Sequence, residues 1–413
     1  MSDAISEAIA DPNTLADPPY AEELFARIRR ESPLSWMTPQ RTRPFWFLSK
    51  HADIIEVERQ PQLFINAPRT ELLTIAEEEQ TRAATGGSHH SRTLLHMDGA
   101  EHRAYRAITQ GWFLPANLRK LEDSMATLAK EYGDRMVAKG KRCEFVNDVA
   151  VWYPLRVIMT IMGIPPQEEP EILRLTQGLV ARKDSSVEGV SHAEDGSLNA
   201  AREIFAYFSA IHDDRKRQPR DELASVIAQA TIDGKPIGHV EALSYYLLIA
   251  TAGHDTTSAT IAGGLLALMQ NPDELAKLRR DPALLVPMAD EMVRWVTPVK
   301  HFFRTATQDY VLRGQQIKQG DGLMLSFVAA NRDEEVFDAP FSFKVDRTPN
   351  PHLGFGHGAH SCVGLHLAKM EIRALFREIL QRFEHIELDG EPSWLAATLS
   401  GGLKQLPIRY TVR

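Results

Sequence analysis

The feature that most constrains the fold of this chain is a glycine-rich segment near its C-terminus that surrounds a single cysteine. The segment reads His352-Leu353-Gly354-Phe355-Gly356-His357-Gly358-Ala359-His360-Ser361-Cys362-Val363-Gly364, and an amphipathic helical pattern follows it to about Gln381. Cys362 therefore precedes a helix N-terminus, where the helix dipole and free backbone N–H groups favour a thiolate. The glycines leave room for something flat and wide to approach the backbone, or for an unusually tight turn.

Two simpler interpretations of this segment leave the glycines unexplained. A lone cysteine is most often a small buried hydrophobe. A zinc site is the second interpretation, because histidines and a cysteine cluster at His352, His357, His360, Cys362 and His366. Their successive separations of 5, 3, 2 and 4 positions match no common zinc spacing, and the cysteines do not pair as CxxC.

The composition excludes several classes of protein. The chain has 413 residues, with 47 Lys and Arg against 55 Asp and Glu, so its formal charge is −8. This acidic balance argues against a nucleic-acid partner, which requires a basic face. The two cysteines, Cys143 and Cys362, are too few and too far apart for a disulfide framework, which indicates a reducing compartment.

The hydropathy pattern predicts a soluble, cytoplasmic protein without a membrane partner. The N-terminus has no cationic start and no apolar run of the signal-peptide type. The most apolar stretch, Ala242–Met269, is interrupted at its centre by His254, Asp255, Thr256 and Thr257, which a membrane span would not tolerate. The length exceeds the roughly 250–300 residues at which single cores stop growing, so we expect two lobes or one large domain.

The periodicity predicts a mainly α-helical protein with small antiparallel β-sheets. Apolar residues recur every three or four positions between Pro115 and Gly140, on one helical face. Similar patterns predict helices at Tyr20–Arg30, His51–Gln60, Ile172–Ala181, Ala200–Arg217 and Glu291–Val296. Strands are expected at Pro44–Ser49 and Gln405–Val412, and a hairpin is expected in which Tyr310–Ile317 and Leu323–Val328 flank Gly320-Asp321-Gly322.

Two polar, glycine-containing segments, Glu77–Arg92 and Lys183–Asn199, are expected to be loose. Each lies between helical patterns. They are interpreted either as lids over a pocket or as mobile loops.

A second chemical signal lies in the middle of the long apolar helix, at Ala252-Gly253-His254-Asp255-Thr256-Thr257. A carboxylate in a buried helix is costly and needs a partner or a purpose. Taken alone, Thr256 bonding back to its own helix and Asp255 pairing with a distant Arg would explain the motif.

A third signal is the pair Glu291 and Arg294, which stand three positions apart on a predicted helix. Such a pair is usually a surface ion pair worth a few tenths of a kcal/mol.

The cysteine segment resembles the haem-binding loop of the cytochromes P-450, the haem-thiolate monooxygenases. The match is Phe355-Gly356-x-Gly358-x-His360-x-Cys362-x-Gly364, with six fixed residues in ten positions. The resemblance implies that haem b is the cofactor and that Cys362 is its axial thiolate ligand, which favours O–O cleavage. It also implies that Phe355 packs near the sulfur and that Gly356 and Gly364 shape the loop.

The same resemblance assigns roles to the other two motifs. It implies that the apolar helix lies on the distal side of the haem, lined by Ala252 and Gly253, and opens there into an oxygen groove. Thr256 would hydrogen-bond to dioxygen, and Asp255 would relay protons from solvent. Glu291 and Arg294 resemble the family's E-x-x-R pair, completed by Arg347 in a Phe-x-x-x-Arg stretch. Thr348 follows Arg347 where many members have an aromatic residue.

Four bases resemble the residues that bind the haem propionates. His102 and Arg106 stand four positions apart on one helical face, Arg304 follows the E-x-x-R helix, and His360 lies in the cysteine loop. The resemblance implies that they clamp two carboxylates through charge-assisted hydrogen bonds.

The resemblance covers the chain from about Tyr20 to its C-terminus. It implies the cytochrome P-450 fold, with a helix-rich lobe and a smaller β-rich lobe around a buried haem. Residues 1–413 would then form one catalytic domain, with residues 1–19 as a loose N-terminal segment. Stretches such as Tyr153-Pro154-Leu155 and Pro298-Val299-Lys300 resemble soluble bacterial enzymes that hydroxylate alpha-terpineol and related compounds.

The function expected from the resemblance is oxygen-dependent hydroxylation of a small hydrophobic substrate. A monoterpenoid is the first candidate, and an aromatic or polycyclic aromatic hydrocarbon is the alternative. The expected pocket is apolar and is lined by Leu248, Ala252, Val299, Phe302, Leu399 and part of Glu77–Leu95.

Electrons are expected from outside the chain, because it has no dinucleotide fingerprint and no Cys₄ cluster. The resemblance implies NAD(P)H, a ferredoxin reductase and a ferredoxin. Candidate residues of a basic docking patch are Arg103, Arg119, Lys120, Lys369 and Arg373.

Two other classes of function stay open at this point. One is a haem-thiolate protein that binds or senses a ligand without oxidising it, against which the Asp255-Thr256 pair argues. The other is a zinc-binding or structural helical protein without haem.

Overall fold

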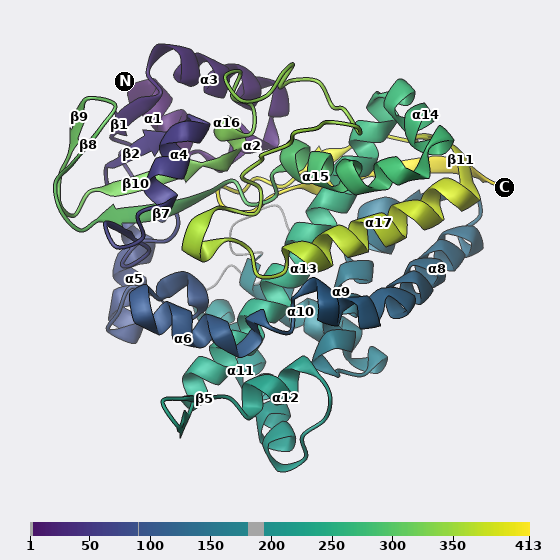
Figure 1. The fold of residues 1–413 in the computed structure, drawn as a ribbon, viewed down its shortest axis with the longest axis horizontal. Helices are drawn as coiled ribbons and strands as arrows, with labels where there is room; N and C mark the ends of the chain where they lie inside the picture. The colour runs from purple at the N-terminus through teal and green to yellow at the C-terminus, as the bar shows by residue number, and fades with distance from the viewer. Residues whose placement is uncertain (1–2, 90, 181–193) are drawn as a thin grey trace.

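A long buried helix, α13, runs through the centre of the molecule and organises the helices around it (Figure 1). The computed structural model describes residues 3–89, 91–180 and 194–413. α13 spans His239–Gln270, and its buried residues occur on all sides, as expected for a helix enclosed by others. α9, α11, α15 and α17 pack against it.

Helices form most of the structure, as predicted. The α-helices are α1 (Asp3–Ala10), α2 (Pro12–Ala16), α3 (Pro18–Glu31), α4 (His51–Glu58), α5 (Ile75–Thr85), α6 (Gly99–Gln110), α7 (Pro115–Leu118), α8 (Glu122–Ala138), α9 (Trp152–Met162), α10 (Glu169–Val180), α11 (Glu194–Arg217), α12 (Leu223–Ala228), α13, α14 (Pro272–Arg280), α15 (Leu285–Val296), α16 (Phe327–Ala330) and α17 (Leu365–Arg382).

The strands form small sheets, which also agrees with the predicted fold class. They are β1 (Leu34–Met37), β2 (Phe45–Leu48), β3 (Phe64–Ile65), β4 (Arg142–Glu144), β5 (Thr231–Ile232), β6 (Lys235–Pro236), β7 (His301–Ala306), β8 (Tyr310–Leu312), β9 (Gln315–Ile317), β10 (Gly322–Ser326), β11 (Phe383–Leu388), β12 (Ser393–Trp394), β13 (Leu403–Gln405) and β14 (Pro407–Val412).

The largest sheet has the strand order β1-β2-β10-β7-β3. Its neighbouring strands are antiparallel except for β2 and β10, which pair in parallel. A second sheet has the strand order β11-β14-β4, and two of its three strands lie near the C-terminus. In Figure 1 the larger sheet lies with α1, α3 and α4 on one side of the molecule, and α8, α9, α15 and α17 gather around α13 on the other.

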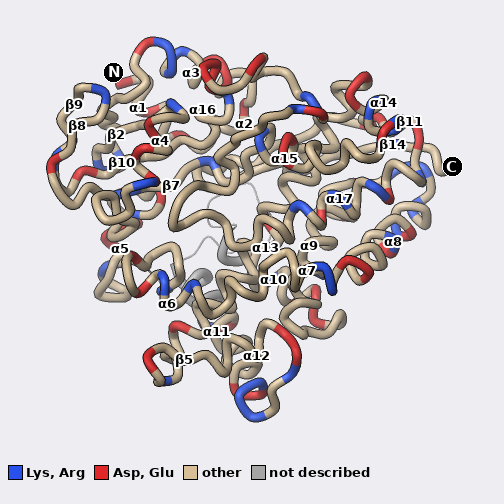
Figure 2. Tube along the Cα trace, viewed as in Figure 1, with Lys and Arg blue, Asp and Glu red and all other residues tan. Residues whose placement is uncertain are grey.

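The main hydrophobic core lies between the helices, and two smaller clusters lie on the five-stranded sheet. α13 packs closely against α15 at Gly264. A Cβ atom added to Gly264 would lie 2.6 Å from the sulfur of Met292. Figure 2 shows charged residues over outer helices such as α8 and α14, whereas the tube of α13 is mostly uncharged. Among the described residues, no helix is both long enough and apolar enough to span a membrane.

The N-terminal segment is ordered, and the expectation that residues 1–19 are loose is wrong for the described part. Residues from Asp3 onward form α1, α2 and the start of α3. Ile5 and Ile9 of α1 are buried in the cluster that also contains Met37, Phe45 and other residues of the sheet. The short α1 and α2 carry too few periodic positions to be recognised, but their apolar face is covered by the sheet.

The expected hairpin around Gly320-Asp321-Gly322 is also wrong. The hairpin forms within the predicted first strand instead, because β8 pairs with β9. Arg313 and Gly314 at its turn have positive φ values of 49° and 73°, as a tight two-residue turn requires. β10 is thereby free to join the larger sheet between β2 and β7.

Of the two segments expected to be loose, the first is largely helical and the second lies mostly outside the described residues. Most of Glu77–Arg92 is helical, because α5 covers residues 75–85. Thr74 and Glu77 form a capping box at its N-terminus, and Gly86 ends it in the left-handed conformation. In Lys183–Asn199, residues 183–193 lie outside the described residues, and residues 194–199 belong to α11.

Candidate functional site

The loop that carries Cys362 is a tight backbone structure in which glycine is required. The amide N–H of Cys362 donates to the carbonyl oxygen of Phe355 at 2.8 Å. Gly356 and Gly358 have positive φ values of 66° and 67°. A Cβ atom at Gly358 would lie only 2.5 Å from the carbonyl oxygen of Glu58, so the loop can pack on the end of α4 only with glycine there.

Cys362 lies three residues before the N-terminal end of α17. Its thiol is free and accessible at the surface, yet protein atoms surround it. Burial raises the pKa of Cys362, and the N–H of Gly364 and the charge of Arg106 oppose that rise. Burial therefore outweighs the expected preference of the helix end for a thiolate, and a cation bound at the sulfur is what would stabilise the thiolate.

The predicted distal residues lie at the middle of α13. Ala252 is exposed and Thr256 is partly exposed, although most of the surrounding helix is buried. The hydroxyl of Thr256 donates to the carbonyl oxygen of Ala252 at 3.0 Å. α13 continues without a break through this motif, so the implied opening of the helix is not present as an interruption of α13.

Asp255 has a neighbouring partner that the motif alone did not reveal. Its Oδ1 atom lies 2.8 Å from Nε2 of His254, whose side chain is fully buried, while the side chain of Asp255 is 31% exposed. The simpler interpretation of the motif placed a distant Arg beside Asp255. The helical position of His254, on the buried face four residues from Ala250, is the sequence signal that could have pointed to it.

The four predicted propionate ligands gather in one cluster from three parts of the chain. His102 and Arg106 come from α6, Arg304 from β7 and His360 from the cysteine loop. The rings of His102 and His360 lie 4.0 Å apart between centroids. Burial, together with repulsion by the nearby Arg304, His102 and Arg106, lowers the pKa of His360 to about 2.

A buried acid, Glu58, joins this cluster and was not predicted. The Nη2 atom of Arg304 lies 2.6 Å from Oε1 of Glu58, and both side chains are buried. Burial raises the pKa of Glu58, whereas Arg304 and the N–H of His357 lower it. Glu58 ends α4 in an ordinary helical context, so nothing in its sequence neighbourhood indicates this role.

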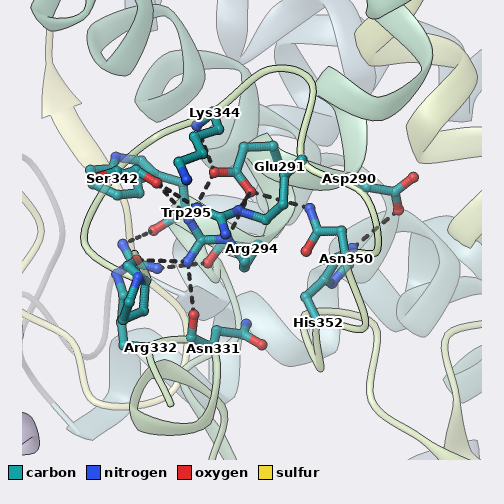
Figure 3. A network of polar contacts seen from close by, with 12 residues as sticks. Asp290, Glu291, Arg294, Trp295, Asn331, Arg332, Ser342, Lys344, Asn350 and His352 are labelled. Carbon is teal, nitrogen blue, oxygen red and sulfur yellow. Dashed lines mark hydrogen bonds and ion pairs between the residues drawn. The ribbon is translucent and has the colours of Figure 1, made fainter. Parts of the chain in front are cut away.

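The predicted trio Glu291, Arg294 and Arg347 forms a buried network (Figure 3). Arg294 binds the Glu291 carboxylate through two hydrogen bonds of 2.7 and 2.8 Å. The Nε atom of Arg347 donates to the same carboxylate at 3.0 Å. The surface-pair interpretation of Glu291 and Arg294 is therefore wrong, since both side chains are fully buried.

This network extends to the segment that precedes the cysteine loop. Asn350 donates to Glu291 at 3.1 Å. The N–H of Leu353 donates to Oδ1 of Asn331 at 2.7 Å, and Arg294 donates to the carbonyl oxygen of Asn331. Figure 3 shows His352 beside Asp290, joined by a contact of 3.1 Å. The network therefore fixes the start of the loop that presents Cys362.

The predicted pocket residues come from both sides of the site. Leu248 and Ala252 are one turn apart on α13. Val299 and Leu399 are neighbours, because Val299 pairs with Ser400 in a β-bridge and Lys300 N–H donates to the carbonyl oxygen of Leu399. Phe302 is two residues from Arg304 on β7 and therefore shares its face of the strand.

The predicted basic patch is only partly free. Arg103, Arg119 and Lys120 are exposed. Lys369 instead forms an ion pair with Asp290, with a distance of 2.5 Å, and Arg373 donates to the carbonyl oxygen of Lys369.

These residues fit a haem. The cluster of His102, Arg106, Arg304 and His360 concentrates donors and positive charge in a buried region, and such a cluster is suited to two carboxylates. The accessible Cys362 precedes α17, and α13, which packs against α17, presents the accessible Ala252. The structure also argues against a zinc site, because the sulfur of Cys362 has no nearby zinc ligands. The described residues contain no group of three or more potential metal ligands.

Comparison with known proteins adds independent information. Residues 187–412 match the family described as Cytochrome P450. Cytochrome P450-terp of a Pseudomonas species is 40% identical over 98% of this chain and 97% of its own length. A steroid C26-monooxygenase of Mycolicibacterium smegmatis is 33% identical over 94% of this chain and 90% of its own length.

Solved structures of cytochromes P450 also resemble this chain in fold. CYP108D1 of Novosphingobium aromaticivorans has a TM-score of 0.92 and 38% identity, covering 100% of this chain and 99% of its own. The cytochrome P450 CYP268A2 of Mycobacterium marinum, solved with pseudoionone, has a TM-score of 0.88 and 28% identity, with 95% of each chain covered.

Replacing Glu291 by Gln should strongly destabilise the protein. The neutral amide would leave two buried guanidinium groups without their carboxylate, which typically costs about 3–5 kcal/mol of unfolding free energy. Urea unfolding followed by circular dichroism measures this cost. The matched control is Glu31→Gln, which breaks the exposed pair between Arg27 and Glu31 and should cost less than about 1 kcal/mol. Equal losses in the two variants would contradict the role of the network.

Proposed function

Because the chain belongs to the cytochrome P450 family of haem-iron monooxygenases, we propose that it uses dioxygen to hydroxylate a small hydrophobic molecule of the monoterpenoid class. The observation that carries the proposal is the accessible Cys362 beside a cluster of bases, just before α17, which packs against α13 with its exposed Ala252 and partly exposed Thr256. When bound, the haem supplies the oxidising chemistry.

The residues of this chain hold the cofactor and control access to it. Cys362 would bind the iron, and His102, Arg106, Arg304 and His360 would bind the two propionates. Phe355, Gly356 and Gly364 would shape the loop, and Ala252 and Gly253 would lie against the opposite face. Glu291, Arg294 and Arg347 would act structurally, by fixing the chain before the loop. The whole chain would then act as one catalytic domain.

Proton delivery would fall to Asp255 and Thr256. The hydroxyl of Thr256 donates to the carbonyl of Ala252, which orients its oxygen atom on the accessible face of α13. Asp255, whose side chain is partly exposed, can exchange protons with solvent. A carboxyl that reaches solvent and a hydroxyl that faces the site are the two ends of a general-acid pathway through water.

Apolar residues around the site support the substrate class. Leu248, Val299, Phe302 and Leu399 would line the pocket, which suits a hydrocarbon skeleton better than a charged molecule. The name of the Pseudomonas relative, Cytochrome P450-terp, and the pseudoionone in the CYP268A2 structure are consistent with this class.

Substrate binding can be tested by absorption spectroscopy of the ferric protein. Displacement of water from the iron by a fitting substrate should convert low-spin to high-spin iron. We expect this shift with alpha-terpineol and related monoterpenoids, and product formation with NAD(P)H and redox partners. A shift only with polycyclic aromatics would overturn the terpenoid assignment. Binding without any product would indicate a ligand-binding or sensing protein instead.

Replacing Thr256 by Ala should uncouple NAD(P)H consumption from product formation. Without the hydroxyl, protons reach oxygen with less control, so more electrons should be lost to peroxide. Haem content and substrate affinity should stay unchanged, because Thr256 is placed in neither the loop nor the propionate cluster. The measurement is product formed per NAD(P)H consumed, which we expect to fall several-fold. Thr260→Ala, on the buried side of α13, is the matched control. Full coupling in the Thr256→Ala variant would refute the role.

Electron delivery would come from NAD(P)H through a ferredoxin reductase and an acidic ferredoxin, in the cytoplasm. The exposed Arg103, Arg119 and Lys120 are the remaining candidates for the docking patch after Lys369 is assigned to Asp290. Charge complementarity of this kind mainly raises the association rate.

Reversing two charges of this patch should slow reduction by the ferredoxin. In the Arg119→Glu and Lys120→Glu double variant we expect the second-order reduction rate to fall about tenfold at low salt, with a smaller effect at high salt because of screening. Stopped-flow absorption measures the rate. The control is the Arg217→Glu and Lys235→Glu double variant, which changes the net charge equally at exposed positions on α11 and β6. Equal rates in the two double variants would exclude the patch.

A further inference from the structure

His254 makes two close contacts through its ring, and both are with oxygen atoms. Nδ1 lies 2.7 Å from the carbonyl oxygen of Ala250, one turn earlier in α13. Nε2 lies 2.8 Å from Oδ1 of Asp255, which is an ion-pair distance, but the direction of the ring N–H does not meet hydrogen-bond geometry. The side chain is fully buried, so water cannot substitute for either contact.

These two contacts require one more proton than a neutral histidine and an ionised aspartate carry together. A carbonyl oxygen only accepts, so the proton on Nδ1 is needed for Ala250. At 2.8 Å, Nε2 and Oδ1 would repel each other through their lone pairs unless one of the two atoms carries a proton. That proton can be on the imidazole, as an ion pair, or on the carboxyl, as a neutral pair. In both forms the pair as a whole is neutral, which lowers the cost of burying it.

Several charged groups of the elements packed on α13 have partners other than His254 and Asp255 among the described residues. Arg156 of α9 pairs with Glu169, Arg215 of α11 pairs with Glu222 of α12, and Glu291 and Arg294 of α15 pair with each other. In α17, Lys369 pairs with Asp290, and burial raises the pKa of Glu371 well above its ordinary value.

The effects of the surroundings on the pKa of His254 together favour the additional proton. Burial by itself lowers the pKa of His254, but the charge and close contact of Asp255 and the carbonyl of Ala250 raise it, and the net shift is upward. Asp255 is the one charged side chain in this balance.

We propose that His254 is a positioning residue that holds Asp255 and shares a proton with it, so that the His254–Asp255 pair is the proton store for oxygen activation. This rests on the proposed function. In the step, the shared proton leaves through the carboxyl of Asp255 toward water and Thr256, and the pair becomes anionic. A proton from solvent then enters through the exposed side of Asp255 and restores it, while the proton on Nδ1 stays on its bond to Ala250.

Nuclear magnetic resonance of ¹⁵N-histidine tests the shared proton without measuring turnover. The diamagnetic ferrous CO form of the holoenzyme is suitable, and loss of a signal in the His254→Gln variant assigns it. We expect the shifts of both ring nitrogens of His254 to indicate protonated or shared-proton nitrogens between pH 6 and pH 8. In Asp255→Asn, one nitrogen should lose its proton. A neutral His254 with an unprotonated, unshared Nε2 at pH 6 in the unmodified protein would overturn the proposal.

Turnover measurements distinguish a positioning role of His254 from a role in packing alone. His254→Gln keeps a donor toward Asp255 but has no titrating proton, so turnover should fall roughly tenfold, less than the 10²–10⁴-fold effect of a general acid itself. The solvent deuterium isotope effect on turnover should rise, because proton delivery becomes slower. The matched control is His212→Gln, which removes another buried histidine, packed on Tyr246 of α13. Turnover and isotope effect should be unchanged in that control.

The outcomes also distinguish this proposal from the proposed function. If His254→Gln and His212→Gln behave alike while hydroxylation proceeds, the proton store is refuted and the monooxygenase stands. If no substrate is hydroxylated by the unmodified protein, the function fails, and the nitrogen shifts still decide whether His254 and Asp255 share a proton.

Discussion

The position of the Cys362 sulfur is the constraint on which the rest of the site depends, and the backbone sets it. The loop is closed by the hydrogen bond from Cys362 N–H to Phe355, and it packs against the end of α4 through Gly358. Its beginning is held by Asn331, which also accepts from Arg294. The buried network around Glu291 and Arg294 therefore fixes the start of the loop that carries Cys362. Such networks add little net stability, but removing one partner leaves a buried charge and is costly.

A second constraint is the concentration of positive charge beside that loop. Burial and the nearby charges of Arg106 and Arg304 lower the pKa values of His102 and His360. Glu58 offsets part of this charge by pairing with Arg304, and it also faces the N–H of His357 in the loop. Glu58 thus ties the base that would bind a propionate to the segment that presents the thiol. The propionates of a haem would supply the remaining negative charge.

The sequence predicted the parts of the site in which chemistry dictates both residue type and spacing. The cysteine loop has six fixed residues in ten positions, and positive φ values require glycine at Gly356 and Gly358, with a close backbone contact also at Gly358. His102 and Arg106 were predictable because a four-residue spacing selects one helical face. The long central helix was predictable from its long apolar run, which only the motif from His254 to Thr257 interrupts.

The parts that were missed depend on contacts between distant segments or on weak local signals. Glu58 meets Arg304 from a position 246 residues away in the chain, and nothing local marks it. α1 and α2 are too short to show a clear period, and the sheet that covers them decides their structure. The hairpin was misplaced because Arg313 adopts a positive φ that its residue type does not favour. His254 was missed because the neighbouring acid and hydroxyl account for the motif by themselves.

The central claim is that Cys362 provides the thiolate ligand of a haem, and the carbon monoxide spectrum of the reduced protein tests it most directly. We expect a pigmented protein whose reduced CO complex has the strongly red-shifted Soret band of thiolate ligation. This band should be lost in Cys362→His and kept in Cys143→Ser, which changes the other free cysteine. A colourless protein, or a red-shifted band that survives in Cys362→His, would contradict the claim.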